Sequence, residues 1–494
     1  MKSKITIHFL LVLLIFYLKI NLSYAQKEDF VWTFGYAVVI DSLSSNGGFN
    51  IDFNTNPPSV YRVNRKINFL GTSSSICDSE GRLIAYSNGC QIANASNEYL
   101  ERGERILSDQ GQFGNFLCKF GFTLYFSTLM LPVPESGDEC VSLFHFSVKW
   151  TGEAPEYFYN DTLFITLICK DLVQKEFRIS ELKKIVDIQN FMNGYFTATK
   201  HANGKDWWIV QKERWTNKYL LYLLKKDGKI EKKTDYAGEN VIWGNCYPQN
   251  KFSPDGRKYA WFDPCIGLYI MDFDRRAGVF SNPVLIPTWT NYNIYSTGGM
   301  EFSPNSRFIY CTTQDSVWQL DLHSKEVAES RTLVQVWDGF RRNGDGIETN
   351  FLFAQSGPDG KIYITNLTNY IHVINKPNLK GTACDFRQRG IVAPTVVGGA
   401  MPYFPNYRLG ALPDIMPEKG DFIVTPNPSM NQLQIHTDLD YISVKLFDIT
   451  GREFFVPFDG AGWVDLSNVP AGVYILALYS EWGTRLAARR VVKM

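Results

Sequence analysis

Phe252-Ser253-Pro254-Asp255-Gly256-Arg257-Lys258-Tyr259-Ala260-Trp261-Phe262 is the clearest copy of a stretch that recurs along this chain. Proline fixes φ at the second position of a tight turn, aspartate favours the turn, and glycine supplies the positive φ that reverses the chain. An aromatic, alternating run follows the turn. The stretch therefore predicts a turn leading into a strand, at one corner of an antiparallel hairpin.

The stretch has a regular period. Further copies span residues 302–310 and 356–364, so the turn positions Gly256, Ser306 and Gly360 are 50 and 54 residues apart. Looser copies lie around Gly204 and Gly81. Strand-only repeats of this length are typical of propeller blades. We predict an all-β fold, a WD40/YVTN-like β-propeller of six to eight blades with seven favoured, and expect these turns on one rim. The alternative is a set of unrelated hairpins in a β-sandwich.

Two stretches interrupt the strand pattern. Residues 41–60 are rich in Ser, Asn, Gly and Pro, which predicts a loop. Residues 175–193 mix charged and apolar side chains, which leaves a short helix or an excursion between blades as alternatives.

The N-terminus has the pattern of a cleaved signal peptide. Lys2 and Lys4 precede an apolar run from Phe9 to Tyr17, and Ser23-Tyr24-Ala25 has the small residues of a cleavage site. We predict a signal peptide at 1–25 and a mature chain that begins near Gln26. No cysteine stands directly after the cleavage site, so we expect no lipoprotein anchor. No later stretch has the roughly 20 consecutive apolar residues that a transmembrane helix needs.

Composition excludes some partners and leaves others open. Lys plus Arg and Asp plus Glu both number 50, so the net charge is zero and no basic field is available for nucleic acid. Aromatic residues make up 15% of the chain. They indicate either β-rich packing or a surface on which carbohydrate could stack.

Motifs of catalysis and cofactor binding are absent from the sequence. There is no Gly-x-Ser-x-Gly, His-Glu-x-x-His or Gly-x-Gly-x-x-Gly, and the six histidines are scattered. His145 and His372 lie in alternating apolar runs, where packed structural histidines are expected. We predict no catalytic residue, no metal ligand set and no cofactor.

One loop, residues 338–348, is rich in side-chain oxygens. Asn343, Asp345 and Glu348 would suit Ca²⁺, but Arg341 and Arg342 place positive charge among them. A solvated turn between blades is the preferred interpretation.

Nine cysteines are an odd number, so at least one has no partner within the chain. Cys246 lies seven residues before Ser253 and Cys265 seven after Lys258, which makes Cys246–Cys265 a possible disulfide across the hairpin. Pro248 argues against a regular ladder there. We expect buried thiols among the other cysteines, and the absence of Cys-x-x-Cys gives no support to a zinc or redox site.

Several motifs in the body of the chain are similar to those of large exported proteins of Bacteroidetes. They are Trp32-Thr33-Phe34-Gly35, Ser73 to Asp78, Tyr86-Ser87-Asn88-Gly89, Lys200 to Trp208 and Ile374 to Cys384. The resemblance covers most of residues 30–407. It implies a propeller-like domain and carries no established activity.

The composition changes at Pro413-Asp414-Ile415-Met416-Pro417-Glu418-Lys419-Gly420. This Pro-rich, charged stretch predicts a linker at 413–421 between a propeller at 26–412 and a final domain at 422–494. Short alternating runs in the final domain predict a small Ig-like β-sandwich.

The final domain closely resembles the type A C-terminal sorting domain of type IX (Por) secretion cargo. The resemblance rests on Pro426-Asn427-Pro428, the Asp448, Gly451 and Arg452 turn, Gly472 and Tyr474 in a Val-x-x-Gly-x-Tyr strand, and the terminal Lys493. It implies recognition by the outer-membrane translocon. It also implies removal of the domain, with release or attachment to surface lipopolysaccharide as alternatives.

The sequence therefore predicts a protein exported by a Sec-type apparatus and then by type IX secretion, to the medium or the cell surface. We interpret the propeller as a binding module for a glycan or protein ligand. The alternative is a propeller-type hydrolase or lactonase with a site at the central channel, assembled from several blades. Inward acids around a metal would favour the enzyme, and an aromatic or neutral face would favour binding.

Overall fold

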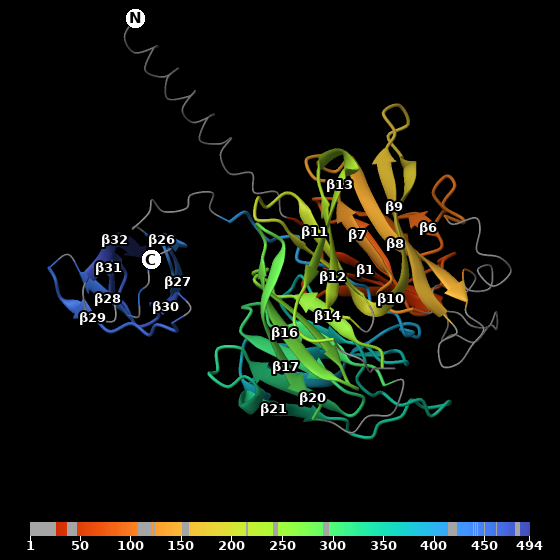
Figure 1. The fold of residues 1–494 in the computed structure, drawn as a ribbon. Helices are drawn as coiled ribbons and strands as arrows, with labels where there is room; N and C mark the ends of the chain where they lie inside the picture. The colour runs from red at the N-terminus through yellow and green to blue at the C-terminus, as the bar shows by residue number, and fades with distance from the viewer. Residues whose placement is uncertain are drawn as a thin grey trace, which may run out of the picture. The chain divides into compact units, whose positions relative to one another are not determined.

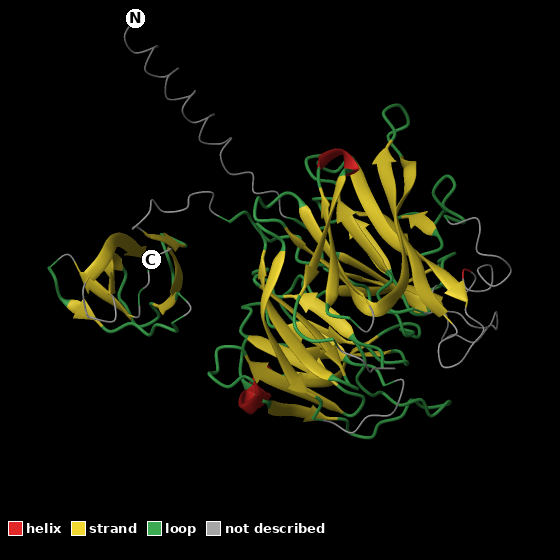
Figure 2. Ribbon diagram, in the orientation of Figure 1, coloured by secondary structure: helices red, strands yellow, loops and turns green. Residues whose placement is uncertain are grey.

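The computed structural model describes residues 26–36, 47–106, 118, 121, 124–150, 158–213, 216–240, 246–289, 296–412, 422–437, 439, 441, 443–448, 450–460, 462–479 and 485–494. Strands form almost all of the regular structure (Figure 2), and the described helices are three 3₁₀ turns at Lys226–Gly228, Ala328–Ser330 and Gly381–Cys384. The chain divides into two compact units, one that ends at Ala411 and one that begins at Leu412. The predicted signal peptide and linker lie outside the described residues.

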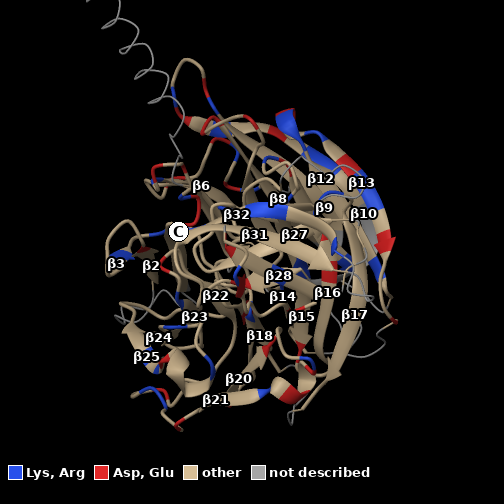
Figure 3. Ribbon diagram, turned by 90° about the vertical axis from the view of Figure 1, so that its left-hand side faces the viewer, with Lys and Arg blue, Asp and Glu red and all other residues tan. Residues whose placement is uncertain are grey.

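The first unit is a β-propeller, as the repeat predicts, and its described strands form seven antiparallel blades. Figure 3 shows them arranged round a ring, from β2 and β3 through β6, β8, β12, β16 and β20 to β24. The N-terminal blades have three described strands each: β1 (Val31–Tyr36), β2 (Gly47–Asp52) and β3 (Ser59–Val63), then β4 (Ser74–Cys77), β5 (Leu83–Ser87) and β6 (Ile92–Asn94).

The last three blades have four strands each, in sequence order. They are β14 (Gln249–Phe252), β15 (Lys258–Asp263), β16 (Gly267–Asp274) and β17 (Val279–Pro287); β18 (Gly299–Phe302), β19 (Phe308–Thr312), β20 (Ser316–Asp321) and β21 (Thr332–Val336); and β22 (Ala354–Ser356), β23 (Ile362–Ile364), β24 (Tyr370–Ile374) and β25 (Phe386–Val392).

Two blades between these groups share one long strand (Figure 1). Strand β10 (Phe177–Lys200) pairs with β9 through its first half and with β11 through its second half. The resulting seven-stranded sheet has the order β13-β12-β11-β10-β9-β8-β7. Its other strands are β7 (Thr128–Pro132), β8 (Cys140–Trp150), β9 (Phe158–Lys170), β11 (Trp207–Glu213), β12 (Lys218–Leu224) and β13 (Ile230–Tyr236).

Two local predictions need correction. The predicted loop at 41–60 contains strand β2 and the start of β3, because Phe49 and Ile51 alternate into the core while β1 and β3 pair on either side. Residues 175–193 are neither helix nor excursion, since most of them belong to β10. In both cases the neighbouring strands outweigh local composition.

The middle of the ring is filled by the chain itself. After β25, residues 397–405 are all buried although they form no regular strand. We call residues 397–408 the channel segment. Pro402 pairs with Ser73 just before β4, the Tyr407 hydroxyl donates to Met130 O of β7 at 2.8 Å, and the Tyr403 hydroxyl donates to Asn250 O of β14. These contacts come from blades on different sides of the ring, so the channel segment ties them together.

The second unit is a small sandwich of two sheets. One sheet has the order β26-β27-β30, and the other has the order β29-β28-β31-β32. Inward side chains from both, including Phe422, Leu446 and Val491, form its core. The strands are β26 (Phe422–Thr425), β27 (Gln432–Thr437), β28 (Ser443–Asp448), β29 (Glu453–Phe454), β30 (Trp463–Asp465), β31 (Gly472–Tyr479) and β32 (Arg485–Lys493).

Across the described residues, no helix has the length and apolar character needed to span a bilayer. Ribbon segments of Lys and Arg are interspersed with segments of Asp and Glu along the outer strands of the propeller, near β10 and β13 (Figure 3).

Candidate functional site

The repeated turns connect the first and second strands of their blades, between β14 and β15, β18 and β19, and β22 and β23. The first two copies are built by the same hydrogen bonds. The Ser253 hydroxyl accepts the Lys258 amide at 2.9 Å, and the Ser303 hydroxyl accepts the Phe308 amide at 2.8 Å. Ser306 takes the positive φ that Gly256 has in the first copy. Equivalent turns therefore present equivalent residues on one face, which we call the turn face.

A cavity of about 290 Å³ opens among these turns. Its walls come from the inner strands of several blades and from the channel segment. They include Thr197 and Thr199 of β10, Lys251 of β14, Pro254, Glu301 of β18, Pro304, Ser356 of β22, Pro358, Phe404, Asn406 and Arg408, and we call this cavity the turn-face pocket.

A buried ion pair forms the floor of the pocket. Lys251 Nζ lies 3.3 Å from Glu301 Oε2, and both side chains are 5% exposed. The ammonium also donates to the Gln355 side-chain oxygen and to Phe404 O, and it lies 4.0 Å from the centre of the Tyr403 ring. Burial lowers the pKa of Lys251, and Glu301 opposes that shift.

The partner carboxylate is equally occupied. Glu301 Oε1 accepts the Phe302 amide at 3.0 Å, and Oε2 accepts the Ser356 amide at 2.9 Å. With three acceptors around three ammonium donors, the pair holds the channel segment in place. It offers no spare proton for chemistry in the pocket.

A second ion pair lies at the pocket wall. Arg408 donates to both oxygens of Asp29, at 2.7 and 2.6 Å, and to Gln26 O at 2.8 Å. Such two-point pairing of guanidinium and carboxylate fixes geometry as well as charge. Arg408 therefore joins the end of the channel segment to the first described residues.

Two perturbed groups lie near this pair. Burial raises the pKa of Glu28 to about 7 and lowers that of Lys200 to about 8, while the opposite charge of each opposes the other's shift. Glu28 Oε2 is buried and makes no hydrogen bond among the described residues. Perturbed groups beside a pocket are candidates for acid–base chemistry.

Sequence reasoning identified the repeated turns that line the pocket but missed its charged residues Lys251, Glu301 and Arg408. The sequence does contain one signal, the polar run Gln249-Asn250-Lys251 directly before the apolar start of the repeat. In the structure all three of these side chains are buried. Their partners lie far away in the sequence, so no local motif marks them.

The structure contains three disulfides among the described residues, Cys90–Cys118, Cys140–Cys169 and Cys246–Cys265. The Cα atoms of Cys246 and Cys265 are 5.8 Å apart, within the range for a disulfide. Cys77, Cys311 and Cys384 are buried thiols. The first two disulfides were not anticipated from the sequence, because no repeat symmetry relates their cysteines.

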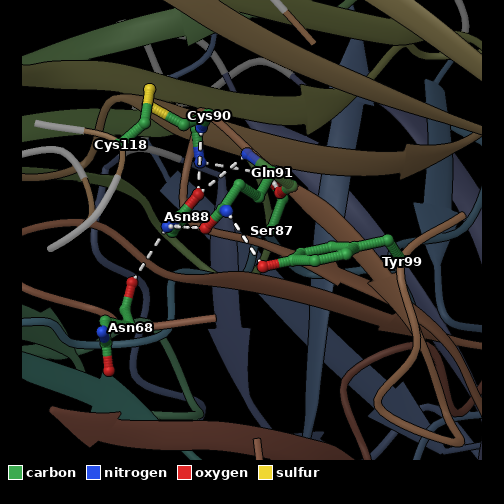
Figure 4. Close-up of a disulfide and its surroundings, with 8 residues drawn as sticks. Asn68, Ser87, Asn88, Cys90, Gln91, Tyr99 and Cys118 are labelled. Carbon is green, nitrogen blue, oxygen red and sulfur yellow. Dashed lines mark hydrogen bonds between the residues drawn. A yellow bond between two sulfur atoms is a disulfide. The ribbon is translucent and has the colours of Figure 1, made fainter. Parts of the chain in front are cut away.

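Figure 4 shows that Ser87 and Asn88, of the motif Tyr86-Ser87-Asn88-Gly89, lie beside the Cys90–Cys118 disulfide. Asn88 Oδ1 accepts the amides of Cys90 and Gln91 at 3.0 and 2.9 Å, and its Nδ2 donates to Asn68 O at 3.0 Å. Together with a fourth bond from Nδ2 to the Gln91 side chain, these bonds occupy the polar groups of Asn88, so this residue supports the blade.

The two central histidines are packed as expected. His145 Nε2 lies 2.9 Å from the Thr166 hydroxyl, and burial lowers its pKa to about 3. Burial also lowers the pKa of His372, to about 4.

In the 338–348 loop, arginines occupy the carboxylates that a calcium ion would need. Arg341 pairs with Glu348 and Arg342 pairs with Asp345.

The predicted sorting residues hold the second unit together. Asn427 donates to Arg490 O at 3.0 Å and accepts the Val492 amide at 2.8 Å, which clamps the segment 426–428 onto β32. Asp448 Oδ1 accepts the Arg452 amide at 3.0 Å across the turn that contains Gly451.

Two more motif positions lie on β31. The Tyr474 hydroxyl donates to Pro470 O at 2.8 Å, and Gly472 pairs with Lys493. Near these positions the apolar side chains of Val473, Ile475 and Phe455 are exposed. The motif residues therefore stabilise the fold, while these neighbours form the accessible surface.

Comparison with known proteins adds to this geometry. Residues 424–493 match the family model of the secretion system C-terminal sorting domain. The protein is therefore type IX secretion cargo, located at the cell surface or outside the cell. No curated protein matches the chain.

Matches among solved structures include a putative 6-phosphogluconolactonase from Bacteroides uniformis, 12% identical, with a TM-score of 0.36 over 75% of this chain and 98% of that one. A functionally unknown protein from Desulfotomaculum acetoxidans is 13% identical, with a TM-score of 0.37 over 74% and 98%. PorZ, a surface component of the type IX secretion system of Porphyromonas gingivalis, is 12% identical, with a TM-score of 0.27 over 91% and 63%. Likeness at this level transfers no activity.

Proposed function

We propose that this protein is an exported binding module whose propeller holds a glycan or protein ligand in the turn-face pocket. The observation that carries the proposal is the pocket itself, because three copies of the repeated turn and the channel segment converge on it. Convergent polar groups with apolar walls are the usual features of a binding site.

The charges of the pocket favour binding over catalysis. Its two acidic residues, Asp29 and Glu301, are both 5% exposed and both ion-paired within the protein. Hydroxyls and prolines dominate the rest of the wall, among them Thr199, Ser356 and Pro304. A neutral, rigid rim of this kind suits a ligand that is recognised by shape and by hydrogen bonds.

The route to the site of action follows from the two ends of the chain. We infer that a signal peptide at 1–25 directs passage through the inner membrane of a Bacteroidetes cell. The propeller at 26–412 and the sorting domain at 422–494 would then be separated by the linker at 413–421, with no cofactor bound.

A hydrolase or lactonase acting at the channel mouth is the second candidate. Glu28 and Lys200 favour it, because both have pKa values near neutrality and lie close to the Asp29–Arg408 pair. Against it, neither side chain lines the pocket.

The test uses mature protein, residues 26–494, on glycan and protein-ligand arrays. Ser356→Phe enlarges a pocket-lining side chain, and Ser281→Phe makes the same change on the exposed outer strand β17. We expect binding that falls at least about tenfold in Ser356→Phe and persists in Ser281→Phe. Equal binding by both variants would place the ligand elsewhere. Hydrolysis of a lactone or ester panel that is lost in Glu28→Gln would establish the enzyme instead.

A further inference from the structure

One corner of the β14–β17 blade gathers two sulfurs and a carboxylate. Cys246 precedes β14, Asp263 ends β15, and Cys265 lies in the turn that leads to β16. The sulfur atoms and a carboxylate oxygen all lie within 4.8 Å of one another. Among the described residues no other group of His, Cys, Asp and Glu side chains is this close.

The carboxylate is buried, and the partners found for it among the described residues are neutral donors. Asp263 is fully buried, and its Oδ1 accepts the Cys265 amide at 2.8 Å. Its Oδ2 makes no hydrogen bond of good geometry within the described part of the chain, and the neighbouring Tyr195 hydroxyl acts on the carboxyl group beside the Cys265 amide. A buried, half-satisfied carboxylate is costly, and a cation is what would satisfy it. This observation is independent of the two cysteines.

We propose that, when the Cys246–Cys265 bond is reduced, this corner binds one Zn²⁺ ion through the two sulfurs and a carboxylate oxygen of Asp263. Two thiolates with one carboxylate favour Zn²⁺ over Ca²⁺ or Mg²⁺. Three protein ligands leave the fourth tetrahedral position for water. A Cα separation of 5.8 Å between the cysteines lets both sulfurs face one ion.

The exchange balances as two steps. Two molecules of a low-molecular-weight thiol transfer two electrons and two protons, so that the S–S bond becomes two thiols and the reductant becomes its own disulfide. Zn²⁺ then binds and releases the two thiol protons to water. Surroundings that contain thiols and zinc therefore select the metal form, and oxidising surroundings select the disulfide.

The Cys140–Cys169 bond provides a matched comparison within the same molecule. It joins β8 to β9, and no described carboxylate gathers with its sulfurs as Asp263 does at the other corner. Reduction should therefore create a metal site at one position and only free thiols at the other.

The test uses mature protein reduced with a phosphine under anaerobic conditions, with Co²⁺ as the spectroscopic probe and Zn²⁺ as the competitor. We expect one Co²⁺ per chain with sulfur-to-cobalt charge-transfer absorption, and no such absorption for the oxidised protein. Cys246→Ser/Cys265→Ser should abolish it, Asp263→Asn should weaken binding at least about tenfold, and Cys140→Ser/Cys169→Ser should leave it unchanged.

A second measurement needs no variant. Zn²⁺ should protect Cys246 and Cys265 of the reduced protein from alkylation, as read by peptide mass, while Cys140 and Cys169 react. Absence of bound cobalt, equal affinity in a folded Asp263→Asn protein, or equal alkylation of all four cysteines would overturn the proposal.

Discussion

The propeller and the sorting domain both join their first and last segments, but by different means. In the propeller Arg408 reaches Asp29 across 379 residues, through an ion pair. In the sorting domain the Asn427 side-chain oxygen accepts a hydrogen bond from the backbone amide of Val492, 65 residues away. The sorting domain carries its closure in a short motif that a sequence reveals. The closure of the propeller depends on residues that belong to no motif. The sequence therefore predicts the blades but not the contacts that join the first and last segments.

The two regions also differ in what they bury. The propeller buries ionisable side chains such as Lys251, Glu301 and Asp263. In the described part of the sorting domain no charged side chain is buried. The difference predicts that charge changes will damage the propeller, whereas the sorting domain will respond mainly to changes in its backbone contacts.

The largest effect is expected from removing the sorting domain, because this tests whether the propeller folds without it and whether the domain directs export. Deletion of residues 420–494 should leave a folded propeller, because the core of the first unit ends before that point. We expect it to accumulate in the periplasm, and replacement of Gly472-Val473-Tyr474 should have the same effect. Fractionation of cells that make full-length and truncated forms measures this. Equal amounts at the surface or in the medium would show that the domain does not direct export.

Next in size is the loss of the buried ion pair. Lys251→Met leaves the Glu301 carboxylate buried and unpaired, which should lower the free energy of unfolding of the propeller by about 3–5 kcal/mol. Lys258→Met removes a pair with Asp272 whose side chains are 37% and 39% exposed, so at most about 1 kcal/mol is expected. Denaturant unfolding followed through the propeller transition compares the two. Similar losses would mean that the buried pair does not hold the channel segment.

A pH dependence should distinguish the regions as well. Because the pKa of Glu28 is about 7 in the folded protein and about 4.5 otherwise, the folded state binds more protons between these values. The contribution of Glu28 to stability should therefore fall by on the order of 3 kcal/mol as pH rises from about 4.5 to 7 and stay level above that. His145 and His372 contribute with the opposite sign below about pH 6.5, because burial lowers the pKa of each.

Melting temperatures from pH 5 to 8 measure this slope. Relative to the wild-type protein, Glu28→Gln should make stability rise more, or fall less, with pH, and Glu80→Gln, a change at an exposed position, should leave the slope unchanged. An unchanged slope in Glu28→Gln would assign the effect to another group.

The smallest effect is expected in the sorting domain. Asn427→Ala removes two exposed hydrogen bonds to β32 and should cost about 1 kcal/mol of its stability. Asn431→Ala is the control, because the Leu466 amide donates to the Asn431 backbone oxygen, which alanine retains. Thermal unfolding of the sorting domain transition gives both values. A loss equal to that of the control would mean that the motif acts in recognition alone.

Local chemistry made part of this molecule predictable. The Pro254-Asp255-Gly256 turn and its copies were recognisable because a turn needs only neighbouring residues. Strand β2 was missed because Gly47 and Gly48 favour loops, while the strands beside it impose pairing. The pocket was missed because Lys251 finds Glu301 and Gln355 about 50 and 104 residues away, and a single sequence does not record such distances.

Arg408 also sets an order of events. Its partners Gln26 and Asp29 are among the first residues to leave the cytoplasm after the predicted signal peptide, whereas Arg408 is among the last of the propeller. Until it arrives, the turn face lacks the wall that the channel segment provides, and the early blades have no closing contact. The chain should therefore cross the inner membrane before the Arg408 contact forms, and the propeller should close only when nearly all of the chain has passed. Under the proposed binding function, the turn-face pocket cannot capture a ligand before translocation is complete.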